Sequence, residues 1–94
     1  MRHYELMTIY NIELGEEGAL GLSEEVKSLI TSLKGKVVSD NFWGKRKFAY
    51  RVGLQEEGYY DVVQFDLEGS KVDSLKKELT SNESIIRYLI SILE

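Results

Sequence analysis

The chain has 94 residues, enough for one domain with one hydrophobic core but too few for a deep catalytic cavity. It contains no cysteine and one histidine, which argues against disulfides, thiolate nucleophiles and multi-histidine metal sites, and no apolar run reaches the length of a membrane span. The net charge of -4 argues against nucleic-acid binding by the whole surface. We therefore expect one cytoplasmic domain over residues 1–94, with no metal, no cofactor and no contact with membranes.

The first elements are a strand and a helix. Residues 4–10 predict the strand because tyrosine, isoleucine, leucine and methionine are dense there. Apolar residues then recur at helical spacing over 22–33, and Gly35 is the expected C-terminal stop of that helix. Acidic residues favour a helix N-terminus and allow the helix to begin as early as Glu16, although two glycines weaken its first turns.

Two strands joined by a hairpin follow. The pattern predicts a strand over 36–43 that resumes over 46–52, and Gly44 between the two parts marks a bulge or a sharp bend. Residues 53–58 predict the hairpin loop, and alternating apolar residues predict the next strand over 59–67.

A second helix and a last strand complete the chain. Ser70 starts the helix, with Asp73 three residues on in a capping-box-like pair, and residues 80–84 end it. Residues 85–93 predict a fourth strand. The order β-α-β-β-α-β is that of the split βαβ, or ferredoxin-like, arrangement, an α+β fold. Right-handed crossovers place both helices on one face of a four-stranded antiparallel sheet with the strand order 4-1-3-2.

Because both helices lie on one side, the other face of this sheet is uncovered. Alternation along the strands predicts an apolar set of side chains on that face, with Arg87 among them: Met7, Ile9, Tyr60, Val62 and Leu89, with Phe42 and Trp43 nearby. Contiguous exposed apolar patches tend to mark interfaces, so these residues are candidates for contact with a partner protein. The alternative is that charged side chains from neighbouring strands partly cover the patch. A register slip of one residue would exchange the two faces.

Charge is segregated along the chain. Residues 41–55 contain no acid and four basic residues, Lys45, Arg46, Lys47 and Arg51, so this window contributes +4 to the total of -4 and leaves -8 for the rest. Basic side chains beside aromatic ones suit phosphate contacts combined with stacking. Lysine and arginine also guard edge strands against aggregation, and the pattern alone does not separate these two roles.

Three short motifs together resemble a known family. They are Arg2-His3-Tyr4-Glu5 at the start, Gly44-Lys45-Arg46-Lys47-Phe48-Ala49-Tyr50 before the hairpin and Gly58-Tyr59-Tyr60 after it. They are similar, in order and spacing, to R-x-Y-E, G-x-R-x-L-A-Y-P and G-x-Y of the bacterial ribosomal protein S six family. The resemblance covers essentially the whole chain. It implies a non-catalytic constituent of the small ribosomal subunit, without a cofactor or small-molecule substrate, that binds the central domain of small-subunit ribosomal RNA together with ribosomal protein S eighteen.

The resemblance also extends to single residues. Arg2 matches the family's N-terminal arginine, and Arg46 and Lys47 match its basic pair. Arg87 matches a basic position in the last strand. The resulting candidates for contact with RNA or the partner are Arg2, Lys45, Arg46, Lys47, Arg51 and Arg87, and no residue is a candidate for catalysis. The chain departs from the family in two respects: Arg51 replaces a proline, which removes a rigid backbone angle, and the C-terminal tail of many relatives is missing.

Two other interpretations use the same topology. An RNA-recognition motif would place a basic residue and a stacking aromatic where this chain has Glu57 and Asp61, and the second acid would repel the RNA backbone. A metabolite-binding regulatory domain, or a small hydrolase, would need a phosphate-binding loop or paired acid–base groups. The best loop candidate carries Glu16 and Glu17, which would repel an anion. A metabolite sensor has no need of a basic hairpin, so the hairpin favours the ribosomal interpretation.

Overall fold

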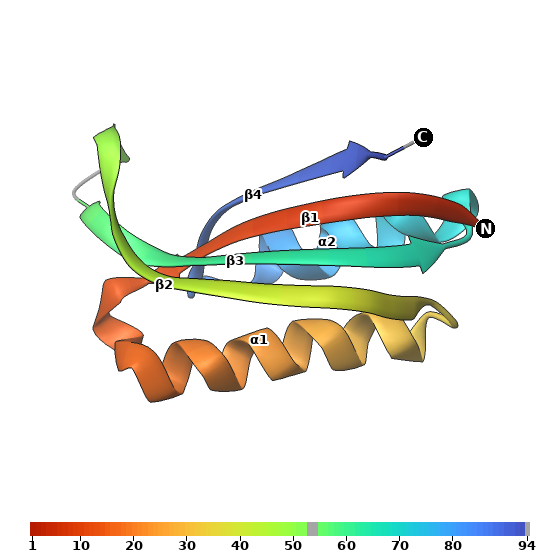
Figure 1. Ribbon diagram of the computed structural model, residues 1–94, viewed down its shortest axis with the longest axis horizontal. Coiled ribbons are helices and arrows are strands. Elements are labelled where there is room, and N and C mark those ends of the chain that lie inside the picture. The colour runs from red at the N-terminus through yellow and green to blue at the C-terminus, as the bar shows by residue number, and fades with distance from the viewer. Residues whose placement is uncertain (53–54, 94) are drawn as a thin grey trace.

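The computed structural model describes the backbone of residues 1–52 and 55–93, and the side chains within 1–47 and 57–93. Strands and helices follow in the predicted order (Figure 1), and a short 3-10 turn precedes each helix. The elements are β1 Arg2–Asn11, η1 Ile12–Leu14, α1 Gly15–Ser32, β2 Lys36–Val52, β3 Gln55–Leu67, η2 Gly69–Lys71, α2 Val72–Ser81 and β4 Ile85–Ile92. The predicted α+β, ferredoxin-like fold is therefore confirmed.

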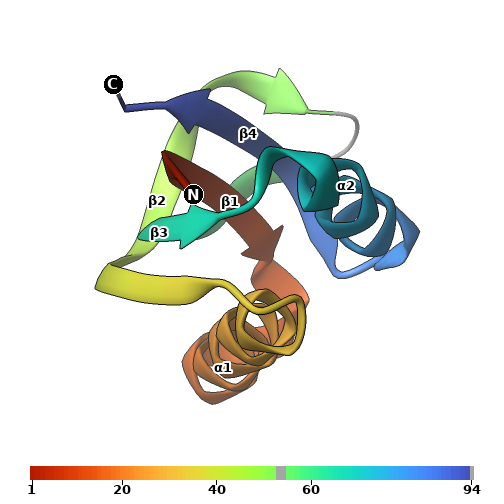
Figure 2. The same cartoon turned by 90° about the vertical axis from the view of Figure 1, so that its right-hand side faces the viewer.

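The strands form one antiparallel sheet in the order β2-β3-β1-β4, which is the predicted order read from the other edge. Both helices lie on one side of this sheet (Figure 2), and the core lies between the two layers. Each fully buried leucine, valine or phenylalanine of this core contributes about 1.5–3 kcal/mol. The core residues are Tyr4, Leu6, Tyr10, Ala19, Leu22, Val26, Ile30, Tyr59, Val63, Phe65, Leu67, Leu75 and Leu79. Within the described ranges, no helix is long and apolar enough to cross a membrane.

The C-terminus of α1 closes with a Schellman motif. Gly35 N–H donates to the Ile30 carbonyl at 2.9 Å, and Lys34 N–H donates to the Thr31 carbonyl at 3.0 Å. The helix stops where it was predicted to stop, but the left-handed residue is Lys34, with a φ of +69°. Gly35 is needed for a different reason, because a Cβ there would lie 2.8 Å from the Asp66 carbonyl oxygen of β3.

The start of α2 differs from the prediction. The capping box of Ser70 and Asp73 does not form, because a 3-10 turn comes first and the helix begins at Val72 without a side-chain cap. The Val72 N–H, which a side-chain cap could have bonded, donates to the Gly69 carbonyl of that turn. A local backbone hydrogen bond therefore replaces the expected side-chain one.

The predicted hairpin loop over 53–58 is wrong in length. β3 begins at Gln55, and the ladder between β2 and β3 continues to the pair of Val52 and Gln55. The glycine and glutamates of this segment have low strand preference, but pairing with the neighbouring strand outweighs it. The result is a longer hairpin that carries the basic residues away from the body of the domain.

Candidate nucleic-acid and protein interface

Strand β2 contains a β-bulge at Gly44. Gly44 has a φ of +84°, a left-handed conformation that favours glycine, and the pairing with β3 shifts register between Phe42 and Gly44. Beyond this point β2 curls away from the plane of the sheet (Figure 1). The predicted irregularity at Gly44 is therefore present as a bulge within one continuous strand.

The two aromatic residues before the bulge point to opposite faces. Phe42 stacks on Tyr59, with ring centroids 6.3 Å apart, and packs against the core. Its predicted place near the open face is wrong, because it pairs with the buried Asp61 and shares that residue's face. Trp43 lies on the open face, where its ring stacks on Tyr60 at 6.1 Å with 6° between the ring planes.

Ile9 lies in the middle of a row across the open face. It pairs with Tyr60 of β3 on one side and with Arg87 of β4 on the other, and only 7% of its surface is exposed. These two longer side chains flank it and limit its contact with any partner. Of these two neighbours only Arg87 is a charged side chain of the kind that the alternative expectation named, and Tyr60 belongs to the predicted patch itself.

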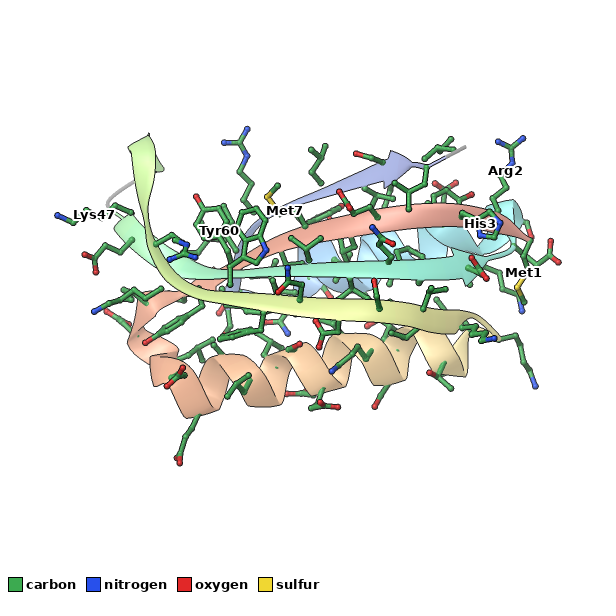
Figure 3. The ribbon with its side chains drawn as sticks, in the orientation of Figure 1. Met1, Arg2, His3, Met7, Lys47 and Tyr60 are labelled. Atoms are coloured by element: carbon green, nitrogen blue, oxygen red, sulfur yellow. The ribbon has the colours of Figure 1, made fainter. Side chains whose placement is uncertain are left out.

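The adjacent row is the accessible apolar part of the face. Met7 pairs with Val62 and with Leu89, and Leu89 is 60% exposed while the other two are half-buried. A shallow hollow of about 320 Å³ opens here, and Figure 3 shows Met7 and Tyr60 close together on this face. Its lining residues are Met7, Ile9, Tyr60, Arg87, Tyr88 and Leu89. We use the name open-face patch for Met7, Trp43, Tyr60, Val62 and Leu89.

Toward the start of β1, the side chains on the open face are polar. Gln64 Nε2 donates to Glu5 Oε2 at 3.2 Å, and beyond this pair the His3 ring contacts the Asp66 carboxylate. The face therefore changes along β1 and β3 from polar at one end to apolar and aromatic near the hairpin. An apolar surface with a polar margin has the anatomy of a protein interface.

The basic run after the bulge, Lys45-Arg46-Lys47, is divided between the two faces of the sheet. Arg46 pairs with Gly58 and points to the open face, on the same side as Trp43. Trp43 and Arg46 are three residues apart, an odd separation that would put them on opposite faces of a regular strand. The bulge therefore brings both to one face. Lys45 pairs with the buried Tyr59 and points to the other face.

The charges of this run are not neutralised within the described part of the chain. Lys45, Arg46 and Lys47 are exposed, and none of them forms an ion pair with another described residue. The side chain of Arg51 lies outside the described residues. The three described cations are therefore available to an external anion.

The other predicted basic residues lie elsewhere. Arg87 is on the open face beside Ile9. Arg2 lies at the opposite end of the sheet from Lys47 (Figure 3), in a molecule whose longest extent is 36 Å. Arg2 and the basic run therefore do not form one contact site, although a long ligand could reach both.

The structure also bears on the RNA-recognition-motif alternative. The positions that would carry stacking aromatics in such a motif, Tyr59 and Asp61, are buried on the helix-covered face. The aromatic residue that reaches the open face is Tyr60, which is out of phase by one residue. A stacking platform of that kind therefore does not exist on this β3.

Comparison with known proteins gives a consistent result. A model of the family described as Ribosomal protein S6 matches residues 3–91. The small ribosomal subunit protein bS6 of Fusobacterium nucleatum is 34% identical over 90 residues, which is 96% of each chain. Its counterpart in Clostridium acetobutylicum is 39% identical over 94 residues, 100% of this chain and 99% of the relative. The crystal structure of 30S ribosomal protein S6 from Thermotoga maritima matches with a TM-score of 0.93 and 33% identity, over 98% of this chain and 87% of that one.

These matches extend over nearly the whole chain and agree in sequence and in fold. The family is one of structural ribosomal proteins and not of enzymes, which confirms the predicted non-catalytic role in translation on the cytoplasmic ribosome. The assignment also decides against a metabolite-binding regulatory domain. The chain belongs to the ribosomal protein S6 family and is a protein of the small ribosomal subunit.

Proposed function

We propose that this chain binds the central domain of small-subunit ribosomal RNA together with ribosomal protein S eighteen. The basic run contacts RNA, and the open-face patch contacts the partner protein. The observation that carries this proposal is the position of Arg46, a cation without an ion-pair partner among the described residues, on the same face as the Trp43–Tyr60 stack. Phosphate-binding and protein-binding chemistry are thereby adjacent on one surface.

Arg46 is the residue best suited to a phosphate. An exposed guanidinium without an ion-pair partner among the described residues can donate two parallel hydrogen bonds to phosphate oxygens, which a lysine cannot do. Lys45 and Lys47 add positive charge around it and strengthen the attraction without fixing an orientation. Such contacts supply affinity and position more than sequence recognition.

The open-face patch suits a protein partner. Leu89 offers an exposed apolar side chain beside the half-buried Met7, and Arg87 stands at the margin of the same hollow. Tryptophan, tyrosine and arginine are the residue types that carry most energy at protein interfaces. Trp43 and Tyr60 supply the two aromatic types here, already stacked on each other.

The RNA part is tested by titrating a central-domain ribosomal RNA fragment with the protein, with and without ribosomal protein S eighteen, at several salt concentrations. Replacing Arg46 and Lys47 by alanine should weaken binding and flatten the slope of log affinity against log salt by about 2, roughly one unit per lost phosphate contact. The matched control replaces Lys76 and Lys77, two exposed lysines of α2, by alanine and should leave the slope unchanged. Equal slopes for the two double variants would refute the assignment of the basic run to RNA.

The partner part is tested with two exposed leucines. Leu89→Ser should reduce the gain in RNA affinity that the partner provides while leaving binding of the protein alone unchanged. Leu20→Ser, on an exposed position of α1 with 43% of its surface accessible, should affect neither quantity. If the two serine variants gave the same partner-dependent gain as the unmodified chain, the open-face patch would not be the partner site.

A further inference from the structure

Asp61 is an acid without access to solvent. It lies on β3, with 0% of its surface exposed, on the face that α1 covers. The Tyr10 hydroxyl of β1 donates to Asp61 Oδ2 at 3.0 Å, and the Ser23 hydroxyl of α1 donates to the same oxygen at 2.6 Å. Burial raises the pKa of Tyr10, so the phenol remains a donor at neutral pH. The interface proposed above lies on the other face and does not use this cluster.

The second oxygen of Asp61 has no hydrogen-bond donor among the residues that the structure describes. Asp61 Oδ1 is buried without a hydrogen-bond partner among the described residues, and so is the hydroxyl oxygen of Thr8, the residue opposite Asp61 on β1. A carboxylate here would hold part of its charge on an unsolvated oxygen, and an unpaired buried charge is strongly destabilising. Protonation of Asp61 removes that charge.

The charges around Asp61 also oppose its ionisation. Asp40 of β2 is the neighbouring acid, and its Oδ2 accepts from Lys27 Nζ at 2.6 Å, while Glu24 Oε1 accepts from the same nitrogen at 2.9 Å. The ammonium group of Lys27 therefore pairs with the carboxylates of Asp40 and Glu24. Burial, followed by the nearby Asp40, raises the pKa of Asp61 to about 6. Burial would also raise the pKa of Asp40, but its contacts with Asp61 and Lys27 outweigh burial and lower it.

We propose that Asp61 is a buried proton-binding site: beneath α1 the folded chain holds a proton on this acid that the unfolded chain has already lost. An aspartic acid in the unfolded chain ionises near pH 3.9. Between about pH 4 and pH 6 the folded chain therefore holds a proton that the unfolded chain has lost, so stability falls as the pH rises through this window. Above it both states are ionised and the dependence ends. The groups that face the site are Thr8 and Tyr10 from β1, Ser23 from α1 and Asp40 from β2, and Lys27 of α1 pairs with Asp40 and with Glu24 beyond it.

The direct test follows the Asp61 side-chain carboxyl carbon by NMR during a pH titration of the labelled, folded protein. We expect a midpoint near pH 6. Asp40→Asn removes the neighbouring negative charge and should move this midpoint downward. A midpoint at or below pH 4.5 in the unmodified protein would overturn the proposal, and this measurement needs no variant to fold.

Equilibrium unfolding gives the second test. The ratio of the unfolding constants of the unmodified chain and Asp61→Asn should rise about a hundredfold between pH 3 and pH 8, a factor of ten for each unit by which the pKa is displaced. Asparagine keeps the shape of the neutral acid and carries no charge, so this variant should be the more stable of the two at neutral pH. Glu68→Gln, at an exposed acid, is the control and should parallel the unmodified chain at every pH. Parallel curves for Asp61→Asn as well would refute the proton site.

Discussion

Replacing Gly44 by alanine tests whether the bulge in β2 depends on a left-handed residue. An added Cβ would meet no heavy atom within 4 Å, so the penalty comes from the backbone conformation alone. At a φ of +84° a residue with a Cβ costs about 1–2 kcal/mol, and this exceeds the benefit of a less flexible unfolded chain. We therefore expect the free energy of unfolding to fall by about 1–2 kcal/mol.

The assay is equilibrium unfolding in urea, in which the midpoint should fall and the slope should stay constant, because the surface exposed on unfolding does not change. Gly44→Asn is the matched control, since asparagine adopts left-handed conformations more readily than alanine and should lose less stability. If alanine cost no more than asparagine, or stabilised the protein, the inferred role of glycine in the bulge would be refuted.

The remaining predictions concern α1. Gly35→Ala should destabilise the protein by about 1–3 kcal/mol, because the Cβ would lie 2.8 Å from the Asp66 carbonyl oxygen and 2.9 Å from Ile30 Cγ2. Gly21→Ala should instead stabilise the protein by about 0.8–1.0 kcal/mol, because Gly21 is within a helix and has open space around it. Both are measured by urea unfolding, and effects of the same sign would contradict the packing at Gly35. Lys34→Gly should raise the melting temperature, because it relieves a left-handed lysine in the Schellman motif, and a lower melting temperature would argue against that strain.

Periodicity made the fold predictable. The alternation of Val63, Phe65 and Leu67 predicts one strand and its buried face, and the helical spacing over 22–33 predicts the first helix. The same alternation extends back to Asp61, which therefore belongs to the buried face. An acid in phase with core residues is the sequence signal of the buried proton site, although its partners from β1, β2 and α1 come together only in the folded chain.

Local backbone features were less predictable. The sequence at Ser70 and Asp73 fits the pattern of a capping box, but the Val72 N–H at the start of α2 is bonded by the Gly69 carbonyl of the 3-10 turn instead. At the end of α1, the sequence rule assigns the left-handed position to Gly35, whereas Lys34 adopts it because Gly35 is required for close contact with β3.

The candidate interface depends on a feature that composition does not reveal. The basic and aromatic residues are evident in the sequence, but strict alternation would separate Trp43 from Arg46, and only the extra residue of the bulge unites them on one face. On β3 the neighbours Tyr60 and Asp61 then point to opposite layers, one to the proposed interface and one to the proton site. The two proposals can therefore fail separately. Asp61→Asn should change the pH dependence of stability without altering the salt slope of RNA binding, and loss of Arg46 and Lys47 should do the reverse.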